Sequence, residues 1–517
     1  MIHAVTERQW HTAISLLEAH WPYYFNAHLA QLLDVLSALP PHMMAQNPRL
    51  RVGRDYLVHM LSGGRKTRVF HEVAADGAAR TPMDRFADLT AQSAALRSAG
   101  RFGEAAALVD KANDLLGHLS GQELREVTHG LPDLQHHWGL TRELAGQHSA
   151  ALREYTSSFH HAVATGHMVM QSMSAASAAW IHALAGRTPS AKDWLSRIPT
   201  PGPEDCWLQS QPAPALFART LLAVDALDID AAQEWIAQVD IQQAIERWSS
   251  YRFLRAVVAL YGDGARAELT DLEAFVAEVP VQQATSGSNA AMLALARHAL
   301  YLALGQSATA ERALHDEDLR RSGTMLADLS AVIDARWLAH AGQLEAARRI
   351  VVPLIAEANA YPRVLIPALF IAGMGYRAAG DKSTGNRYIL DALHLVPAHG
   401  PFHSIVADKR RLFEEMVAEG VLDASILERV PATRMPKTVN PFAALTSREH
   451  ETLLHAVSGR AVAQIAERMF VSPNTVKSHL RSVYRKLGVT NRDELVDLAQ
   501  QHGYRTGPKM TASQRDT

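Results

Sequence analysis

A short unit centred on glycine recurs through most of this 517-residue chain. In each copy a helix-forming run ends in Ala-Gly or Leu-Gly, and a polar residue then precedes an alanine-rich helix start. Clear copies are centred on Gly100, Gly146, Gly186, Gly305, Gly342 and Gly380, and weaker ones on Gly64, Asp228 and Gly264. Successive centres are 36, 46, 40, 42, 36, 41, 37 and 38 residues apart, which predicts a repeated supersecondary unit.

The unit has the local chemistry of a helical hairpin. Glycine ends the first helix in a left-handed conformation that other residues adopt only with strain, and alanine lets the second helix approach closely. A hairpin alone exposes its apolar face, so neighbouring hairpins must stack. We therefore expect an all-α chain in which residues 1–420 form an α-solenoid. An irregular all-helical domain is the alternative.

Composition limits the cellular setting and the kinds of site. The single cysteine, Cys206, excludes an internal disulfide framework and a cysteine-rich metal site. The first 30 residues lack a signal-peptide pattern, and no stretch approaches 18 uncharged apolar residues, so we expect a cytoplasmic protein without a membrane span. The 26 histidines are scattered, and pairs such as His136-His137 and His160-His161 are better explained as surface or core residues than as metal ligands.

Positive charge is concentrated at the C-terminal end. Residues 441–517 hold 11 Lys and Arg against 7 Asp and Glu, a net charge of +4, whereas the whole chain is at −2 and the remainder therefore at −6. This asymmetry is typical of a nucleic-acid-binding module attached to a larger body. A proline-containing linker over 421–444 precedes the module, which we place at 445–503, and 504–517 is expected to be a disordered tail.

Four helices are predicted within the module from their end signals. Thr446 and Glu449 form a capping box before the first helix, and the second spans about 462–469. Ser472 caps the third helix, with Pro473 in its first position and Gly488 after its end. The fourth helix is expected to start after a Thr490 cap, with two acidic residues, Asp493 and Glu494, in its first turn.

The third helix separates apolar from basic residues. Projected at 100° per residue, Val476, Leu480, Val483 and Leu487 share one face, and the opposite side carries Asn474, Lys477, Ser478, Arg481 and Arg485. The basic side holds no acidic residue. Cations with short polar neighbours suit guanine edges and phosphates in the major groove of double-stranded DNA.

The module resembles the LuxR-type (GerE-like) helix-turn-helix domain in "LTSRE", "IAERMFVSPNTVKSHLRSVYRKLGV" and "NRDELVDLA". The resemblance implies a scanning helix at 462–469 and a recognition helix at 473–487. Thr475, Lys477, His479 and Arg481 stand at motif positions that contact DNA in that family. We expect Lys477, Ser478 and Arg481 near base edges, and Thr475, His479 and Arg485 nearer phosphates. A purely structural role explains His479 equally well.

Two positions depart from that pattern. The family usually has Ser-Asn before the scanning helix and a glutamate before the Ile-Ala pair, whereas this chain has Ala461-Val462 and Gln464. Alanine cannot cap as serine does, a loss of about 1 kcal/mol. In the fourth helix we expect Leu495, Leu498 and Ala499 to be exposed for dimer contacts, as in the family; core packing against the first helix explains some of them equally well.

The early segment "LLDVLSALPPHMMAQNPRLRVGRDYLVHMLSGG" and the late segment "AAGDKSTGNRYILDALHLVPAHG" followed by "PFHSIVADKRRL" give residues 1–420 a further resemblance. They are similar to the tetratricopeptide-like helical arm of the large ATP-binding LuxR-type regulators of the maltose-operon activator class. Their nucleotide-binding module is not expected here. "SGGRKTRVF" has Lys66-Thr67 without a preceding glycine, and "GMGYRAAGDKST" has Asp381 where a phosphate loop needs lysine. We expect no cofactor and no enzyme, since no nucleophile elbow or H-E-x-x-H helix is present.

These observations favour a DNA-binding transcriptional regulator that acts as a homodimer. The helical arm would sense a small effector or a protein partner, and RNA polymerase is a further candidate partner. Aromatic residues could line such a sensing surface, although inter-repeat core explains them better: Trp180, Trp194, Trp207, Trp235, Trp248, Tyr251 and Trp337. The alternative function is a helical-repeat scaffold without sequence-specific DNA binding.

Overall fold

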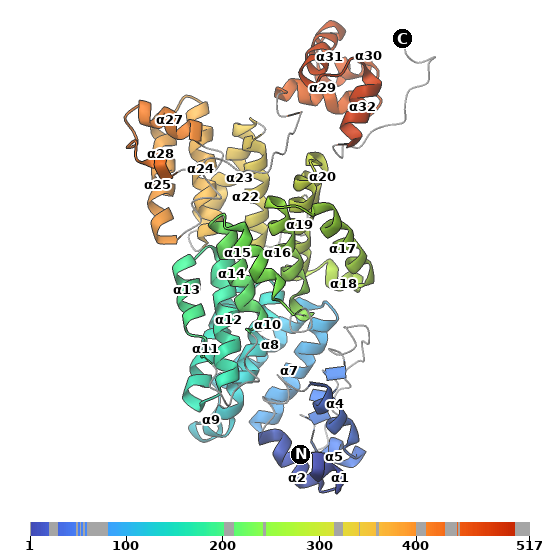
Figure 1. Cartoon of the computed structure of the whole chain (residues 1–517), viewed down its shortest axis with the longest axis vertical. Helices are drawn as coiled ribbons and strands as arrows, with labels where there is room; N and C mark the ends of the chain where they lie inside the picture. The colour runs from blue at the N-terminus through green and yellow to red at the C-terminus, as the bar shows by residue number, and fades with distance from the viewer. Residues whose placement is uncertain are drawn as a thin grey trace. The chain divides into compact units, whose positions relative to one another are not determined.

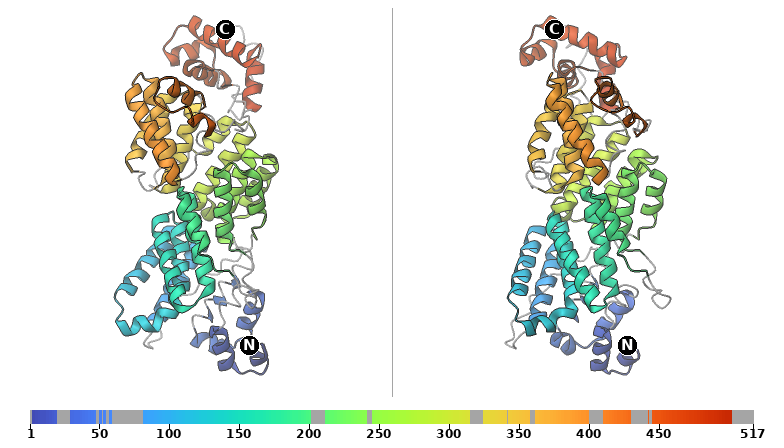
Figure 2. Two further views of the ribbon diagram at one scale, coloured as in Figure 1. Left: turned by 60° about the vertical axis from the view of Figure 1, so that its left-hand side comes forward. Right: turned by 90° about the vertical axis from the view of Figure 1, so that its left-hand side faces the viewer.

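The structure, a computed structural model, describes residues 2–19, 29–47, 50, 51, 53, 54, 57, 58, 81–200, 211–240, 245–314, 324–340, 342–357, 361–399, 410–429, 442 and 445–501 (Figure 1). Helices are the regular elements of these ranges, and the turned views of Figure 2 show no strand in them, which confirms the all-α prediction. Several predicted features lie outside the described residues: Gly64, Lys66-Thr67, Cys206, Trp207, most of the 421–444 linker and the 504–517 tail.

The chain divides into two compact units, which we describe separately. The first comprises Met1–Ala223, Asp230–Leu254 and Phe275–Leu293, and the second comprises Val224–Ile229, Arg255–Ala274 and Ala294–Thr517. Helices α14 (Ala213–Asp225), α15 (Ile229–Ala237), α16 (Trp248–Tyr261), α17 (Ala265–Glu278) and α19 (Gly287–Ala303) each contribute residues to both.

The first unit begins with four short helices around a small apolar core: α1 (Ile2–Thr6), α2 (Trp10–Ala19), α4 (Leu29–Ala38) and α5 (Pro41–Gln46). Seven helices follow in the described residues: α7 (Pro82–Ser98), α8 (Phe102–Gly117), α9 (Gly121–Val127), α10 (Leu131–Leu144), α11 (His148–Thr165), α12 (Met168–Ala185) and α13 (Thr188–Ser196). Helix α7 packs on α8, and each of α10, α11 and α12 packs on the helix that follows it. The short α18 (Val281–Ala284) also belongs to this unit.

The second unit continues the pattern of consecutive packed helices. It contains α20 (Ser307–Ala313), α22 (Met325–His340), α23 (Leu344–Glu357), α24 (Pro362–Ala378), α25 (Lys382–His399), α27 (Arg410–Ala418) and α28 (Ile426–Arg429). Helices α22 to α25 pack pairwise in chain order, and Phe370 meets Phe413 edge-on in a core shared by α24, α25 and α27. The helices of the C-terminal module are described below.

The predicted glycine turns are present. The centres at Gly100, Gly146, Gly186, Gly264, Gly305, Gly342 and Gly380 all have φ between +72° and +95°. The weak copy near Asp228 uses a different residue, because Leu227 takes the left-handed conformation there, with φ +59°. The helical hairpin is therefore confirmed as the local unit, and the tetratricopeptide-like solenoid remains a prediction.

The segment around Asp381, which resembles a phosphate loop in sequence, is one of these glycine turns. Gly380 ends α24, and the Asp381 carboxylate accepts a hydrogen bond from the backbone N–H of Thr384 at 3.0 Å, in the first turn of α25. The same bond lowers the pKa of Asp381. Aspartate stands here as a helix cap, which explains the sequence without a nucleotide.

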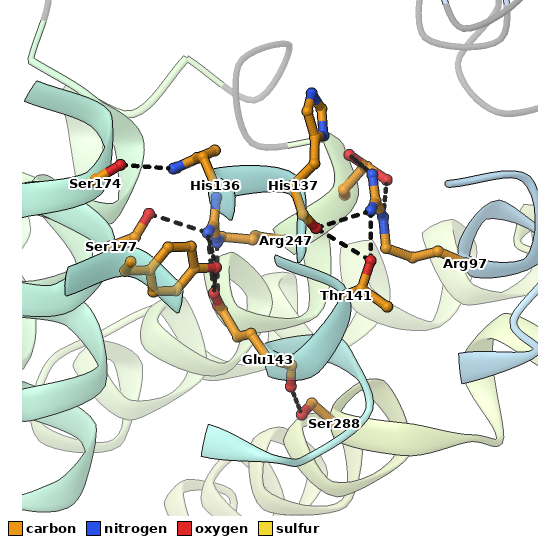
Figure 3. A network of polar contacts seen from close by, with 11 residues as sticks. Arg97, His136, His137, Thr141, Glu143, Ser174, Ser177, Arg247 and Ser288 are labelled. Atoms are coloured by element: carbon orange, nitrogen blue, oxygen red, sulfur yellow. Dashed lines mark hydrogen bonds and ion pairs between the residues drawn. The ribbon is translucent and has the colours of Figure 1, made fainter. Parts of the chain in front are cut away.

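A buried ion pair ties late residues of the first unit to its early hairpins (Figure 3). Arg247, in the short 3-10 helix Ile245–Arg247, donates to both carboxylate oxygens of Glu143 at 3.0 and 2.9 Å. The Tyr155 hydroxyl donates to the same carboxylate at 2.6 Å, and Arg247 also reaches Ser177 Oγ at 3.1 Å. Because 104 residues separate Arg247 from Glu143, the pair joins distant parts of the chain.

The residue before Arg247 makes the opposite pairing. Glu246 accepts from Arg97 of α7 at 2.7 and 3.0 Å, and Arg97 donates further to Thr141 Oγ1 at 2.9 Å. Arg97, Glu143 and Arg247 are all buried. Removing one member of a buried pair typically destabilises a protein by about 3–5 kcal/mol, since it leaves a charge unpaired. The two pairs therefore hold α7, α10, α11, α12 and the Ile245–Arg247 segment in one arrangement.

Most of the arm's described tryptophans belong to the core. Trp180, Trp194 and Trp248 are buried, and Trp180 packs edge-on against Phe217. The core prediction is confirmed for these three. Trp235, Tyr251 and Trp337 are partly exposed. No described helix is long and apolar enough to span a membrane.

Two glycines in the first unit allow the cost of a left-handed backbone to be distinguished from the cost of steric crowding at the added Cβ. Gly100 (φ +77°) and Gly166 (φ +71°) are both left-handed, but a Cβ at Gly100 would lie 2.6 Å from the backbone of Gln282 and Gln283, and one at Gly166 would meet nothing within 4 Å. We predict that Gly166→Ala lowers the free energy of unfolding by about 1–2 kcal/mol, the left-handed penalty alone. Gly100→Ala should lower it by clearly more. Denaturant unfolding of both variants measures the difference, and equal losses would contradict the close approach.

Candidate nucleic-acid interface

The C-terminal module is built from four helices: α29 (Ser447–Val457), α30 (Val462–Met469), α31 (Pro473–Leu487) and α32 (Arg492–Gln501). Its core is made by Phe442, Leu445, Leu453, Ala456, Val457, Ile465, Ala466, Met469, Val476, Leu480, Val483, Leu495, Val496 and Ala499. Every residue of this cluster comes from 442–499. The module therefore has an apolar core of its own.

Local end signals fix helices α29 and α31 as predicted. The Thr446 hydroxyl accepts from the Glu449 N–H at 3.3 Å, and the Glu449 carboxylate accepts from the Thr446 N–H at 2.7 Å, which completes the capping box. Ser472 Oγ accepts from the Thr475 N–H at 3.1 Å, and Gly488 ends α31 with φ +69°. The predicted bounds of the recognition helix, 473–487, are confirmed.

Two other ends differ from simple expectation. Ala461 provides no capping oxygen, but its N–H donates to the Gln464 side chain at 3.1 Å, so half of a capping box survives before α30. The predicted Thr490 cap of α32 is wrong by one residue. The helix starts at Arg492, and Asn491 Oδ1 accepts from the Glu494 N–H at 2.9 Å, while Thr490 donates to the Glu494 carboxylate.

The fourth helix turns inward more than we expected. Leu495 and Ala499 are fully buried in the module's core, so the expectation that they are exposed is wrong, and core packing against α29 explains them. Leu498 is partly exposed at the edge of the same core. A dimer contact through α32 therefore remains a prediction that rests on Leu498 among the three.

Two basic residues of the module serve its interior. Lys486 Nζ lies 2.6 Å from Glu449 Oε2 and so links α31 to the capping box of α29. Arg492 donates to the carbonyl oxygens of Ala456 and Arg460, both at 2.6 Å, and so satisfies the end of α29 from α32. Sequence reasoning gave neither residue a role, because both partners lie more than 30 residues away.

The outer face of α31 carries exposed cations. Val476, Leu480 and Val483 are buried, which turns the predicted DNA-contact residues outward: Asn474, Lys477, Ser478, Arg481 and Arg485 are exposed, and Thr475 and His479 are half-buried. Thr475 is held close to the cap, since its hydroxyl lies 2.8 Å from Ser472 Oγ. Among the described residues, Lys477 and Arg481 have no ion-pair partner and stand free for a ligand.

The turn between α30 and α31 holds a residue that the sequence analysis passed over. Phe470 is 95% exposed and has φ +54°, so a large apolar side chain occupies a left-handed position in solvent. Such a conformation disfavours a residue with a Cβ by about 1–2 kcal/mol. The detectable signal was a phenylalanine at the helix end, where glycine or asparagine is usual.

The Glu449–Lys486 contact predicts an acid-sensitive module. Burial raises the pKa of Glu449, but hydrogen bonds from Lys486, Ser482 and Thr446 outweigh it and lower the pKa to about 2. A depressed carboxyl pKa stabilises the fold above the ordinary value of 4.5, and this stability is lost as the pH falls towards 2. We predict that Glu449→Gln weakens the module at neutral pH and flattens its loss of stability between these pH values.

Hydrogen exchange of the α29–α32 amides in the full-length chain, followed over that pH range, measures this effect. The matched control is Glu451→Gln, because Glu451 is on the same helix, is more exposed, and forms an exposed pair with Arg448. An acid profile of Glu449→Gln that overlays the wild type would show that the contact contributes nothing.

Comparison with known proteins agrees with this geometry. Residues 443–499 match the family of bacterial regulatory proteins called the luxR family. "Probable transcriptional regulatory protein SgaR" of Hyphomicrobium methylovorum is 48% identical over 59 residues, which are 11% of this chain and 28% of that protein. The response regulator UvrY of Escherichia coli K12 is 39% identical over 67 residues, 13% of this chain and 31% of UvrY.

A longer relative shows the same limited overlap. The HTH-type regulator Mb0914c of Mycobacterium bovis is 42% identical over 62 residues, which are 12% of this chain and 7% of that protein. This chain thus spans less than a third of the length of each of these relatives. No solved structure matches the chain.

Proposed function

We propose, from the premise that residues 443–499 are a helix-turn-helix domain of the LuxR family, that the chain is a DNA-binding transcriptional regulator. The outer face of α31 carries the proposal. It presents Lys477 and Arg481, free of ion pairs among the described residues, next to the small side chain of Ser478. A helix with this face can enter the major groove, where its cations bind guanine edges and phosphates.

The two kinds of cation in the module support this assignment. Lys486 and Arg492 are bound to groups of the module itself, whereas Lys477 and Arg481 are exposed. A structural helix would not need the second pair. We assign Lys477, Ser478 and Arg481 to base edges, and Thr475, His479 and Arg485 to phosphates. Asn474 is a further DNA-binding residue.

The remaining parts of the proposal concern the whole chain. We propose a cytoplasmic protein that binds DNA as a homodimer, with Leu498 at the edge of its α32 contact. The helical arm would receive an effector or a protein partner and pass the signal to the module, with RNA polymerase as a further partner. This part rests on the predicted repeat, because stacked helical hairpins form extended surfaces that bind partners.

We predict that Lys477→Ala with Arg481→Ala abolishes site-specific binding and leaves the helical circular dichroism unchanged. If both cations neutralise phosphates, the slope of log K against log salt should also become less negative by about 0.9 per lost contact. Genomic DNA captured by the full-length protein supplies the binding sites, and fluorescence anisotropy at several salt concentrations supplies the slope.

The matched control removes the same two charges elsewhere. Arg410 and Arg411 of α27 are exposed and pair with Glu414 and Glu415 of the same helix, and Arg410 also donates to the Leu427 carbonyl at 3.4 Å. Arg410→Ala with Arg411→Ala should leave specific binding intact. If the wild type captures no DNA even at low salt, the scaffold function replaces the proposal. If the α31 double variant binds like the wild type, the wrong face has been assigned.

A further inference from the structure

The exposed ring in the turn of the helix-turn-helix is the feature of the module that the charged face does not explain. Phe470 is 95% exposed, and the other exposed large apolar residue of this module, Leu454, is only 43% exposed. Phe470 is also left-handed, with φ +54°. Residues held in strained backbone conformations are concentrated at active sites, ligand-binding sites and switch regions.

The position of Phe470 identifies the ligand. The residue follows α30 directly, and Ser472 and Pro473, which begin α31, come two and three positions later. In this motif the first helix crosses the DNA backbone and the N-terminal residues of the second meet the base edges. A ring at the junction therefore lies where the backbone passes into the major groove. Lys477 and Arg481, on the helix that starts there, supply the complementary charge.

We infer that Phe470 is a DNA contact that packs its ring against an apolar edge of a nucleotide. This inference rests on the proposed function. Two groups on DNA offer such an edge, the 5-methyl group of thymine in the major groove and the C–H face of a deoxyribose, and phenylalanine is suited to both. The contact removes from water a ring that the free protein leaves exposed.

The strain gives the test a signature that a structural role would not produce. Glycine and asparagine adopt the left-handed conformation readily, so Phe470→Gly and Phe470→Asn should raise the melting temperature of the module or leave it unchanged. The same variants should weaken DNA binding about tenfold, the effect of losing part of an aromatic side chain's burial. Phe470→Tyr keeps the ring and should bind within about twofold of the wild type.

The experiment uses the full-length protein and short duplexes cut from the genomic sites that the wild type captures. Leu454→Ala is the matched control, because it removes an exposed apolar side chain from α29 and should leave affinity unchanged. Replacing each thymine singly by deoxyuridine separates the two sources. If the loss of one methyl group weakens DNA binding by the wild type but not by Phe470→Asn, the contact is assigned to that thymine. If no single replacement weakens binding by the wild type, and Phe470→Asn still binds the unmodified duplex more weakly than the wild type, the contact is assigned to the deoxyribose.

Three outcomes would overturn the inference. Phe470→Asn that binds as tightly as the wild type would show that the ring does not touch DNA. If Phe470→Asn keeps wild-type affinity for DNA but loses transcription in a reporter assay, the ring contacts a protein partner such as RNA polymerase instead. A wild type that binds no DNA at low salt would overturn the proposed function and the inference together, and only that outcome involves both.

Discussion

The left-handed turn at the end of a helix is the constraint on which the hairpins of this protein depend. A residue with positive φ lets a helix end and the chain reverse direction within two or three residues. Glycine supplies this conformation at Gly100, Gly146, Gly186 and at four later copies, so the hairpins recur with the spacing of the glycines. Core packing then decides how the hairpins stack, but the glycines decide where each begins.

A few residues other than glycine also adopt positive φ, and they differ in whether the fold explains the conformation. Among the described residues the non-glycine positions with positive φ are Arg8, Leu227 and Phe470. Leu227 is half-buried and sits in a repeat copy that lacks its glycine, so packing compensates for its strain. Phe470 is almost fully exposed, so among the described residues no packing compensates for its conformation. The same backbone conformation is therefore structural in one place and points to a ligand in the other.

Sequence reasoning succeeded where the interaction is local. The Thr446–Glu449 box, the Ser472 cap and the Gly488 turn each depend on residues three or four positions apart, so their spacing reveals them. The sequence does not distinguish Asn491 from Thr490 as the cap of α32, because either of two neighbouring polar residues can cap a helix. Side-chain periodicity also gives only the relative orientation of residues, which is why Leu495 and Ala499 were placed on the outside. Arg247 and Glu143 carry no local signal at all, since 104 residues separate them.

The charges of Glu246 and Arg247 fix the alignment in which the Ile245–Arg247 segment packs against its neighbouring helices. The two residues are adjacent and opposite in sign, and each meets an opposite charge on a different helix, Arg97 on α7 and Glu143 on α10. A slip by one residue would bring Arg247 towards Arg97 and set like charges together in a buried place. Apolar side chains tolerate such a slip more readily than ions do. The order of these two residues therefore allows the Ile245–Arg247 segment to pack against α7 and α10 in one alignment only.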